Sequence, residues 1–238
     1  DHLLRLKIYH LGGALPLSDA VPTLENFGFT VLESVPTPLE DGRLGFIHDF
    51  LLELRSEERC DSLIARSDEI EAAITSVLDG EAENDAFNQL ITTAGIDARS
   101  TVWMRAWFRY LRQTGLSYGL VTVVEALAEA PDVTAAMITL FRALHDPDFE
   151  GDRAKAASAA IRDMDSALVS VHAIDDDRIL RLFRAVIESI LRTNAFAYQA
   201  GEALAFKIES AKIPELPAPV PWREIFVYSP RVEGIHLR

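Results

Sequence analysis

A change in the spacing of apolar residues divides this chain into two parts. Up to about residue 54, short runs alternate apolar and polar side chains, which is the pattern of β-strands with one buried face. From about Ser67, apolar residues recur at every third or fourth position, as on one face of an α-helix. Because one segment cannot satisfy both periods, the pattern predicts a small sheet-containing unit followed by a mainly helical region.

The first part contains four elements in the order strand, helix, strand, strand. Gly12 and Gly13 end the first strand, and Ser18 is a suitable N-cap for the helix that follows. Gly28 supplies the stop at the end of that helix. The four elements span residues 3–10, 18–27, 29–35 and 43–54. This order is the front half of a ferredoxin-like βαββαβ unit.

The second part is expected to be almost entirely helical. A helix begins at Ser67, and the helix at 100–115 is apolar or aromatic on nearly every side, so we expect it to be buried. Residues 170–174 fit either a loop or a short strand. Four prolines within 214–221 predict a stiff, extended linker, and 224–229 predicts a final strand. The later helices are expected at 84–93, 100–115, 117–129, 132–145, 153–171 and 176–210.

Composition limits the functions that such a chain can have. Its 238 residues suffice for one large domain or two small ones, and 49% of them are hydrophobic, which is enough for a packed core. The net charge of −14 argues against binding to nucleic acid or to an anionic membrane, because both require a basic surface. With a single cysteine, Cys60, no intramolecular disulfide can form, which suits a reducing cytosol. No apolar run approaches the length of a membrane span.

Motifs that would indicate catalysis or a metal site are weak. His48-Asp49 lies on a predicted strand, where neighbouring side chains point to opposite faces and do not easily share a metal ion. The run from Asp146 to Gly151 resembles the start of a calcium loop, but Ala157 stands where the bidentate glutamate belongs. The chain has no phosphate-binding glycine loop, no Cys-x-x-Cys and no nucleophile elbow. We therefore predict no catalytic, cofactor-binding or metal-binding residue.

For two sets of residues, both a ligand-binding role and a purely structural role remain open. Arg105, Arg109 and Arg112 share one helix face and could bind a phosphate or a carboxylate, although ion pairs with acidic residues at 81–85 are favoured. The turn at Gly12-Gly13, ahead of a capped helix, offers backbone N–H groups to an anion or carboxylate. The other interpretation of that turn is a tight connection without a ligand.

The sequence resembles the large bacterial NAD-specific glutamate dehydrogenases in three stretches. The first is Leu17 to Phe29, which is similar to a segment of an ACT-like domain in that family. The second runs from Gly80 to Asn88 and continues in the arginine-containing helix. The third comprises Arg192-Thr193-Asn194 and the final fifteen residues, EIFVYSPRVEGIHLR. These matches are spread over nearly the whole chain.

This resemblance implies an α+β fold: a small ferredoxin-like (ACT-like) α/β unit followed by a mainly α-helical domain. We expect the ACT-like unit at 1–57, the helical domain at 58–213, and a Pro-rich linker with the first strand of the catalytic region at 214–238. ACT domains often bind amino acids near the turn between their first strand and first helix. The resemblance thus implies an effector site at Gly12, Gly13, Leu15 and Ser18.

The function that the resemblance implies belongs to a longer polypeptide. The chain begins without Met in a strand-like run and ends after another, so we expect it to be an internal piece. The parent protein would convert L-glutamate and NAD to 2-oxoglutarate and ammonia, with its catalytic residues outside this chain. We expect no NAD bound here, the remaining domains of the same polypeptide as partners, homo-oligomerisation and a cytoplasmic location. The alternatives are a purely structural assembly segment without an effector site, and a helical metal-dependent hydrolase.

Overall fold

The computed structural model describes residues 2–54, 60–197, 202–214 and 216–238. The chain forms two compact units, Asp1–Thr93 and Ala94–Arg238. Both combine helices with an antiparallel sheet, so the predicted α+β class is confirmed. The domain limits predicted at residues 57 and 213 stay predictions. No helix in the described part of the chain is long and apolar enough to cross a membrane.

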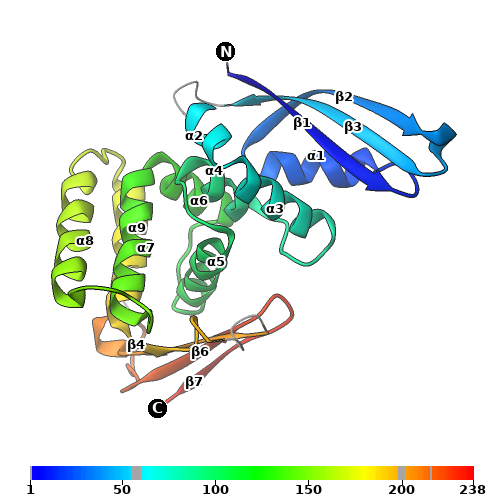
Figure 1. Cartoon of the computed structure of the whole chain (residues 1–238). Helices are drawn as coiled ribbons and strands as arrows, with labels where there is room; N and C mark the ends of the chain where they lie inside the picture. The colour runs from blue at the N-terminus through cyan, green and yellow to red at the C-terminus, as the bar shows by residue number, and fades with distance from the viewer. Residues whose placement is uncertain (1, 55–59, 198–201, 215) are drawn as a thin grey trace. The chain divides into compact units, whose positions relative to one another are not determined.

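The first unit opens with the predicted order of strand, helix, strand, strand (Figure 1). The strands form one antiparallel sheet in the order β1-β3-β2, with Leu4 opposite Leu52 and Val31 opposite the same residue on the other side. A shift in register between Val31 and Glu33 adds a bulge to β2. The elements are β1 (Leu3–Leu11), α1 (Leu17–Asn26), β2 (Phe29–Leu39), η1 (Glu40–Gly42) and β3 (Gly45–Leu54).

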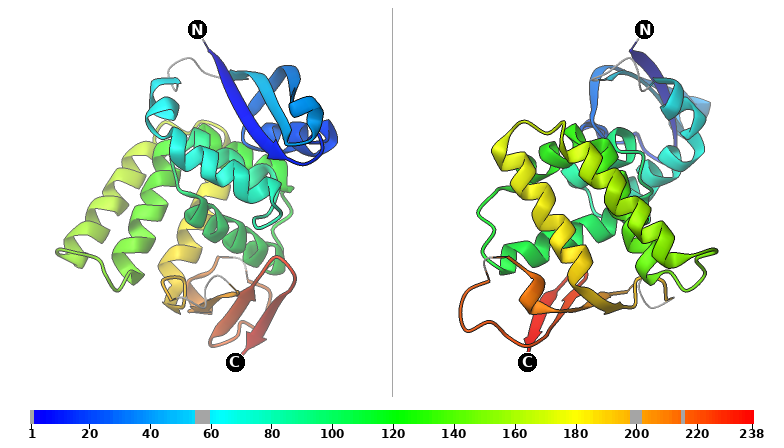
Figure 2. Two further views of the ribbon diagram at one scale, coloured as in Figure 1. Left: turned by 45° about the vertical axis from the view of Figure 1, so that its right-hand side comes forward. Right: turned by 90° about the vertical axis from the view of Figure 1, so that its left-hand side faces the viewer.

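Further helices complete this unit and cover one face of its sheet (Figures 1 and 2). Helix α3 begins at Ser67 as predicted and buries Ile70, Ile74 and Val77 on one face. The predicted helix at 84–93 is divided, because the Asp85 side chain accepts from the Phe87 N–H and starts a short 3-10 turn first. The elements are α2 (Cys60–Ala65), α3 (Ser67–Leu78), η3 (Ala86–Asn88) and α4 (Gln89–Thr93).

The second unit is built around α5 (Ala98–Gln113), whose predicted burial is confirmed. Trp103 and Trp107 are almost fully buried, and both rings pack edge-on against Phe141 at 4.9 and 5.0 Å between centroids. The carboxylate of Asp97 caps α5 by accepting from the Ser100 N–H at 2.6 Å. The other helices are α6 (Leu120–Glu129), α7 (Pro131–His145), α8 (Arg153–Leu168) and α9 (Ile174–Ser189).

A four-stranded sheet closes the second unit, as Figure 1 shows below α5. All neighbouring strands are antiparallel, in the order β4-β5-β6-β7. Its inner face packs on the helices through aromatic contacts such as Trp107 with Phe206 and Tyr110 with Phe226. The elements are β4 (Ile190–Thr193), β5 (Leu204–Ile208), η5 (Ser210–Lys212), β6 (Glu224–Tyr228) and β7 (Glu233–Leu237).

The prediction of one long helix over 176–210 was wrong. The helix ends at Ser189, and Ile190 adopts an extended backbone that starts β4. The Asn194 side chain then joins β4 to β5, because it accepts from the Ala205 N–H at 2.7 Å and donates to the Ala203 carbonyl at 2.9 Å. In β5 the side chains of Leu204, Phe206 and Ile208 are buried in alternation, as expected for a strand with one face on the core. Residues 198–201 of the predicted helix lie outside the described residues.

A buried polar pair fastens β6 to α5. The Tyr110 hydroxyl, on a side chain with no exposed surface, donates to Glu224 Oε2 at 2.7 Å. Burial first, then the hydrogen bond and the negative charge of Glu224, raise the pKa of Tyr110 above its usual range, so the phenol stays protonated and keeps donating. Glu224 is itself only 3% exposed, so it depends on such donors.

We predict that Tyr110→Phe lowers the free energy of unfolding by about 1–3 kcal/mol, because the buried Glu224 carboxylate loses a donor while the ring contact is kept. Urea denaturation followed by tryptophan fluorescence measures the change. The matched control is Tyr118→Phe, which removes a hydroxyl bonded to Asp175 at an exposed position. That variant should stay within about 0.5 kcal/mol of wild type. Equal losses in both variants would contradict the argument.

Candidate functional site

The turn between β1 and α1 carries the predicted effector residues. Gly12 adopts a positive φ of 85°, which favours glycine, and its N–H donates to the Leu44 carbonyl at 3.4 Å. A Cβ added at Gly13 would meet no atom within 4 Å, so the turn is open to solvent there. Within the described structure, the N–H groups of Gly13 and Ala14 form no hydrogen bond. These two donors are what the turn offers to a ligand.

A buried histidine anchors the far side of this turn. The Leu15 N–H donates to His48 Nε2 at 3.0 Å, and His48 is only 2% exposed. An accepting Nε2 places the proton of a neutral ring on Nδ1, which finds no partner within the described part of the chain. Burial first, and the positive charge of a protonated His10 second, lower the pKa of His48 below 6.5. The Leu15 N–H is therefore committed to the fold.

His10 holds the same turn from the other side. Its Nδ1 lies 2.8 Å from the Gly13 carbonyl oxygen, and because that oxygen only accepts, Nδ1 must donate. The two histidines thus fix the carbonyl of Gly13 and the N–H of Leu15, two residues apart. The backbone between them is pre-shaped, which lowers the ordering cost for any ligand that binds it.

Ser18 does not cap α1 as predicted. The N-cap is Pro16, whose carbonyl accepts from the N–H groups of Asp19 and Ala20 at 3.0 and 3.1 Å. Ser18 lies inside the first turn, and its hydroxyl donates to Asp19 Oδ1 at 3.2 Å. The cap moves because Pro16 cannot donate and suits an extended position just before a helix. Ser18 therefore orients an exposed carboxylate at the start of α1.

A groove runs from this turn between β1 and α3. Its volume is about 290 Å³, and Leu15 is the one predicted effector residue that lines it, beside His10. Gly12, Gly13 and Ser18 lie outside its lining. Its lining combines apolar residues with two acidic ones, Glu71 of α3 and its C-cap Asp79. The groove is lined by Leu6, Lys7, Ile8, Tyr9, His10, Leu15, Glu71, Ile74, Thr75, Leu78 and Asp79.

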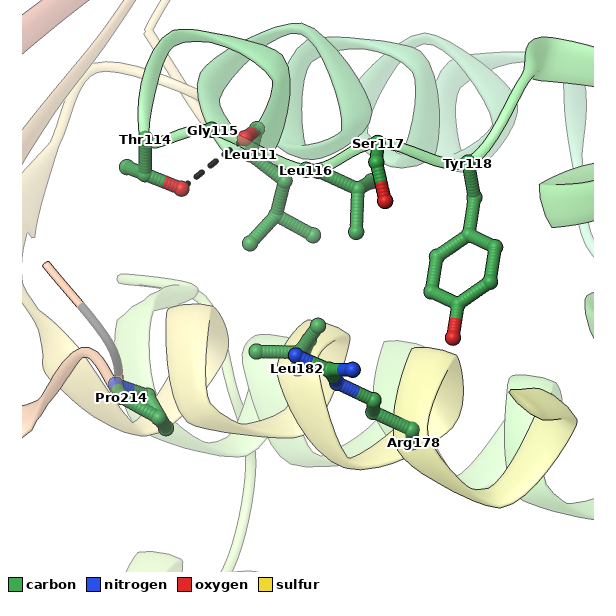
Figure 3. A pocket seen from close by; sticks show the side chains of 9 residues that line it. All are labelled: Leu111, Thr114, Gly115, Leu116, Ser117, Tyr118, Arg178, Leu182 and Pro214. Atoms are coloured by element: carbon green, nitrogen blue, oxygen red, sulfur yellow. Dashed lines mark hydrogen bonds between the residues drawn. The ribbon is translucent and has the colours of Figure 1, made fainter. Parts of the chain in front are cut away.

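The second unit holds a smaller cavity, shown in Figure 3. It lies between the loop after α5 and helix α9, where Tyr118, Arg178 and Leu182 face one another. The Tyr118 hydroxyl donates to Asp175 Oδ1 at 2.6 Å, which already commits this polar group. The cavity's volume of about 90 Å³ is well below the 290 Å³ of the groove beside β1.

The other motifs singled out from the sequence have structural partners. His48 faces the core while Asp49 points to the opposite face and pairs with Arg5 at 3.0 Å, as the strand geometry predicted. Arg109 pairs with Glu233 at 2.6 Å, which joins α5 to β7. The Asp146 side chain accepts from the Asp148 N–H within its own turn. Among the described residues, no three His, Cys, Asp or Glu side chains gather where they could hold a metal ion.

Three family models match successive parts of the chain. A model described as the ACT3 domain of glutamate dehydrogenase matches residues 1–63, and one described as helical motif 3 of glutamate dehydrogenase matches 82–147. A model described as the catalytic domain of bacterial NAD-glutamate dehydrogenase matches 163–238. This last match begins upstream of the Pro-rich segment, where the sequence had suggested that the catalytic region starts.

Three relatives, each named NAD-specific glutamate dehydrogenase, are similar over nearly the whole chain. The protein of Pseudomonas aeruginosa is 39% identical over 252 aligned positions, which cover 100% of this chain and 15% of the relative. The protein of Halomonas elongata is 36% identical and covers 99% of this chain, and that of Mycobacterium tuberculosis is 37% identical and covers 97%. The chain again spans 15% of the length of each.

Matches to an ACT domain, a helical motif and a catalytic domain, in this order, define a segment of a multidomain protein. The chain belongs to the bacterial NAD-specific glutamate dehydrogenase family, as the three sequence stretches predicted. The ACT-like character of the first sheet is confirmed by the same matches.

His48 makes the stability of the first unit depend on pH. Its folded pKa is lowered, so it stabilises the fold fully above the unfolded value of 6.5, and this contribution is lost as the pH falls through the folded pKa. Protonated Nε2 can no longer accept from the Leu15 N–H. We predict weaker protection of β1 and β3 amides against hydrogen exchange as the pH falls from 7.5 to 5.

In His48→Gln, the amide oxygen can still accept from Leu15 but does not titrate, so protection should change less with pH. His172→Gln is the control, since His172 is exposed. Exchange is compared in β1 and β3 alone, after correction for the intrinsic pH dependence of exchange. If protection in His48→Gln depended on pH as strongly as in the wild type, His48 would not be the group responsible.

Proposed function

We propose that this chain is a regulatory and architectural segment of an NAD-dependent glutamate dehydrogenase. The parent protein would convert L-glutamate and NAD to 2-oxoglutarate and ammonia. The observation that carries this proposal is the series of three family segments, matched in order along one chain at residues 1–63, 82–147 and 163–238. In this proposal NAD binds outside this segment, and the remaining domains of the same polypeptide, in a cytoplasmic homo-oligomer, are the partners.

An amino-acid effector is proposed to bind at the turn formed by Gly12, Gly13, Leu15 and Ser18. The N–H groups of Gly13 and Ala14, together with the positive end of α1, suit a carboxylate. Asp19, held by the Ser18 hydroxyl, supplies a negative group for the ammonium. A zwitterionic amino acid matches both charges, whereas an inorganic anion would be repelled by Asp19.

A second candidate is a purely architectural segment without an effector. The contacts of α5 with the sheet of the second unit favour it, because Arg109 and Gln113 both bind Glu233 and so tie a rigid helix to β7. This candidate predicts no binding at the turn. The two are therefore separated by ligand titration.

We predict that titration calorimetry of the chain with each L-amino acid detects binding of at least one. Gly13→Pro should weaken it by about 10- to 100-fold, the worth of one charge-assisted hydrogen bond, because proline has no N–H. Gly13→Ala is the matched control: it keeps the N–H, and its methyl group meets no atom within 4 Å. Absence of binding to all amino acids would favour the architectural candidate.

The dehydrogenase assignment has its own test. The full-length protein should reduce NAD in the presence of L-glutamate, and the 238-residue chain alone should not. Failure of the full-length protein would overturn the proposed reaction whatever the calorimetry shows. Failure of the calorimetry alone would remove only the effector.

A further inference from the structure

Strand β1 is an edge strand of the three-stranded sheet that the described residues form. In a complete βαββαβ unit a fourth strand pairs with the first, on the side away from the third. Here β1 pairs with β3, and no described strand lies against its other edge. An exposed edge of this length is a template for pairing with another extended chain.

The register shows which backbone groups face outward. His2 accepts from the Leu54 N–H at 2.8 Å, and the Gly12 N–H donates to the Leu44 carbonyl, so even-numbered residues of β1 bond toward β3. In an antiparallel pair the alternate residues direct their N–H and C=O away. The outward groups belong to Leu3, Arg5, Lys7, Tyr9 and Leu11.

The side chains beneath this edge are incompletely covered. Leu4, Leu6 and Ile8 point to the helix-covered face but are only partly buried, although they pack against the core cluster. The groove of about 290 Å³ between β1 and α3 lies directly beside Leu6 and Ile8. A second cavity of about 120 Å³ continues along Leu4 toward Ile70. Alternate apolar side chains of an added strand would fill this space.

Charge restricts what can occupy the groove. Two acidic residues line it: Glu71 of α3, and Asp79, the C-cap that follows this helix. If two copies paired through their β1 edges about a two-fold axis, the acidic residues of both copies would approach one another, and so would Lys7 of both. Like charges brought together in this way oppose pairing. An extended segment with a basic residue opposite α3 would instead complement the acidic residues.

We propose that β1 pairs with an extended segment from another part of the same full-length polypeptide, with alternate apolar residues and at least one Lys or Arg. Each relative is several times longer than this chain, which spans 15% of it, so such a segment is available. Covalent linkage raises its effective concentration far above that of a second copy. The added strand satisfies the outward backbone groups and buries Leu6 and Ile8 against α3.

Photo-crosslinking in the full-length protein tests the proposal. p-Benzoylphenylalanine replaces Tyr9, which is 69% exposed and would flank the added strand. The expected product joins Tyr9 to one apolar-alternating segment of the same polypeptide, identified by mass spectrometry. Mixed isotope-labelled preparations reveal whether the two ends come from one copy. A product between copies, or none, overturns the proposal. The probe at Val35, on the opposite edge strand β2, should not reach the same segment.

Two pairs of variants test whether the crosslink depends on backbone pairing with β1 and on burial of side chains in the groove. Lys7→Pro removes one outward N–H without touching the bonds to β3, whereas Lys7→Ala keeps it. Thr75→Trp fills the groove from α3, whereas Ala72→Trp adds the same ring to an exposed position outside the lining. Crosslink yield should fall by about five-fold or more in the first member of each pair only, as expected for losses of 1 kcal/mol or more. Retained protection of β3 amides shows that the unit still folds. Unchanged yield in both test variants would refute the proposal.

Discussion

The pairing of β3 with both of its neighbours is the constraint on which the first unit depends. This central strand fixes the register of β1 and β2, and its alternation decides which side chains enter the core. One consequence is that His48 faces inward under the β1–α1 turn while Asp49 faces outward toward Arg5. A slip of one residue would exchange the two and remove the acceptor for the Leu15 N–H. The geometry of the turn is therefore a property of the sheet.

Most of the fold followed from hydrophobic period alone, and the exceptions have physical causes. The order of the first four elements and the burial of α5 were predictable, because period 2 and an apolar surface on all sides are strong signals. The long helix over 176–210 was not, since helix-favouring alanines before Leu204 concealed the alternation of Leu204, Phe206 and Ile208. Side-chain bonds from Asn194, formed only once the sheet exists, end the ambiguity in favour of strands.

The turn that carries the candidate site was predictable from the sequence, but the contacts that hold it were not. Glycines before a helix indicated the turn, yet nothing in sequence spacing connects Leu15 to His48, which stands 33 residues away. That contact requires the β1–β3 register, a long-range property. The capping role assigned to Ser18 failed for a local reason, because Pro16 suits the position before the helix. A side chain that looked like a cap instead holds Asp19.

In the proposed arrangement, the effector turn and the strand groove share Leu15. Its N–H is bonded to His48 and its side chain lines the groove, so a ligand that shifts this residue changes the surface offered to an added strand. Thermodynamic linkage makes this effect reciprocal. If the added strand binds more tightly when Leu15 is in one position, strand binding also raises the affinity for a ligand that requires that position. In this proposal, the segment thus influences chemistry elsewhere in its polypeptide. The coupling is limited by the differential contacts of one side chain, a few kcal/mol at most, which is the usual scale of allosteric coupling.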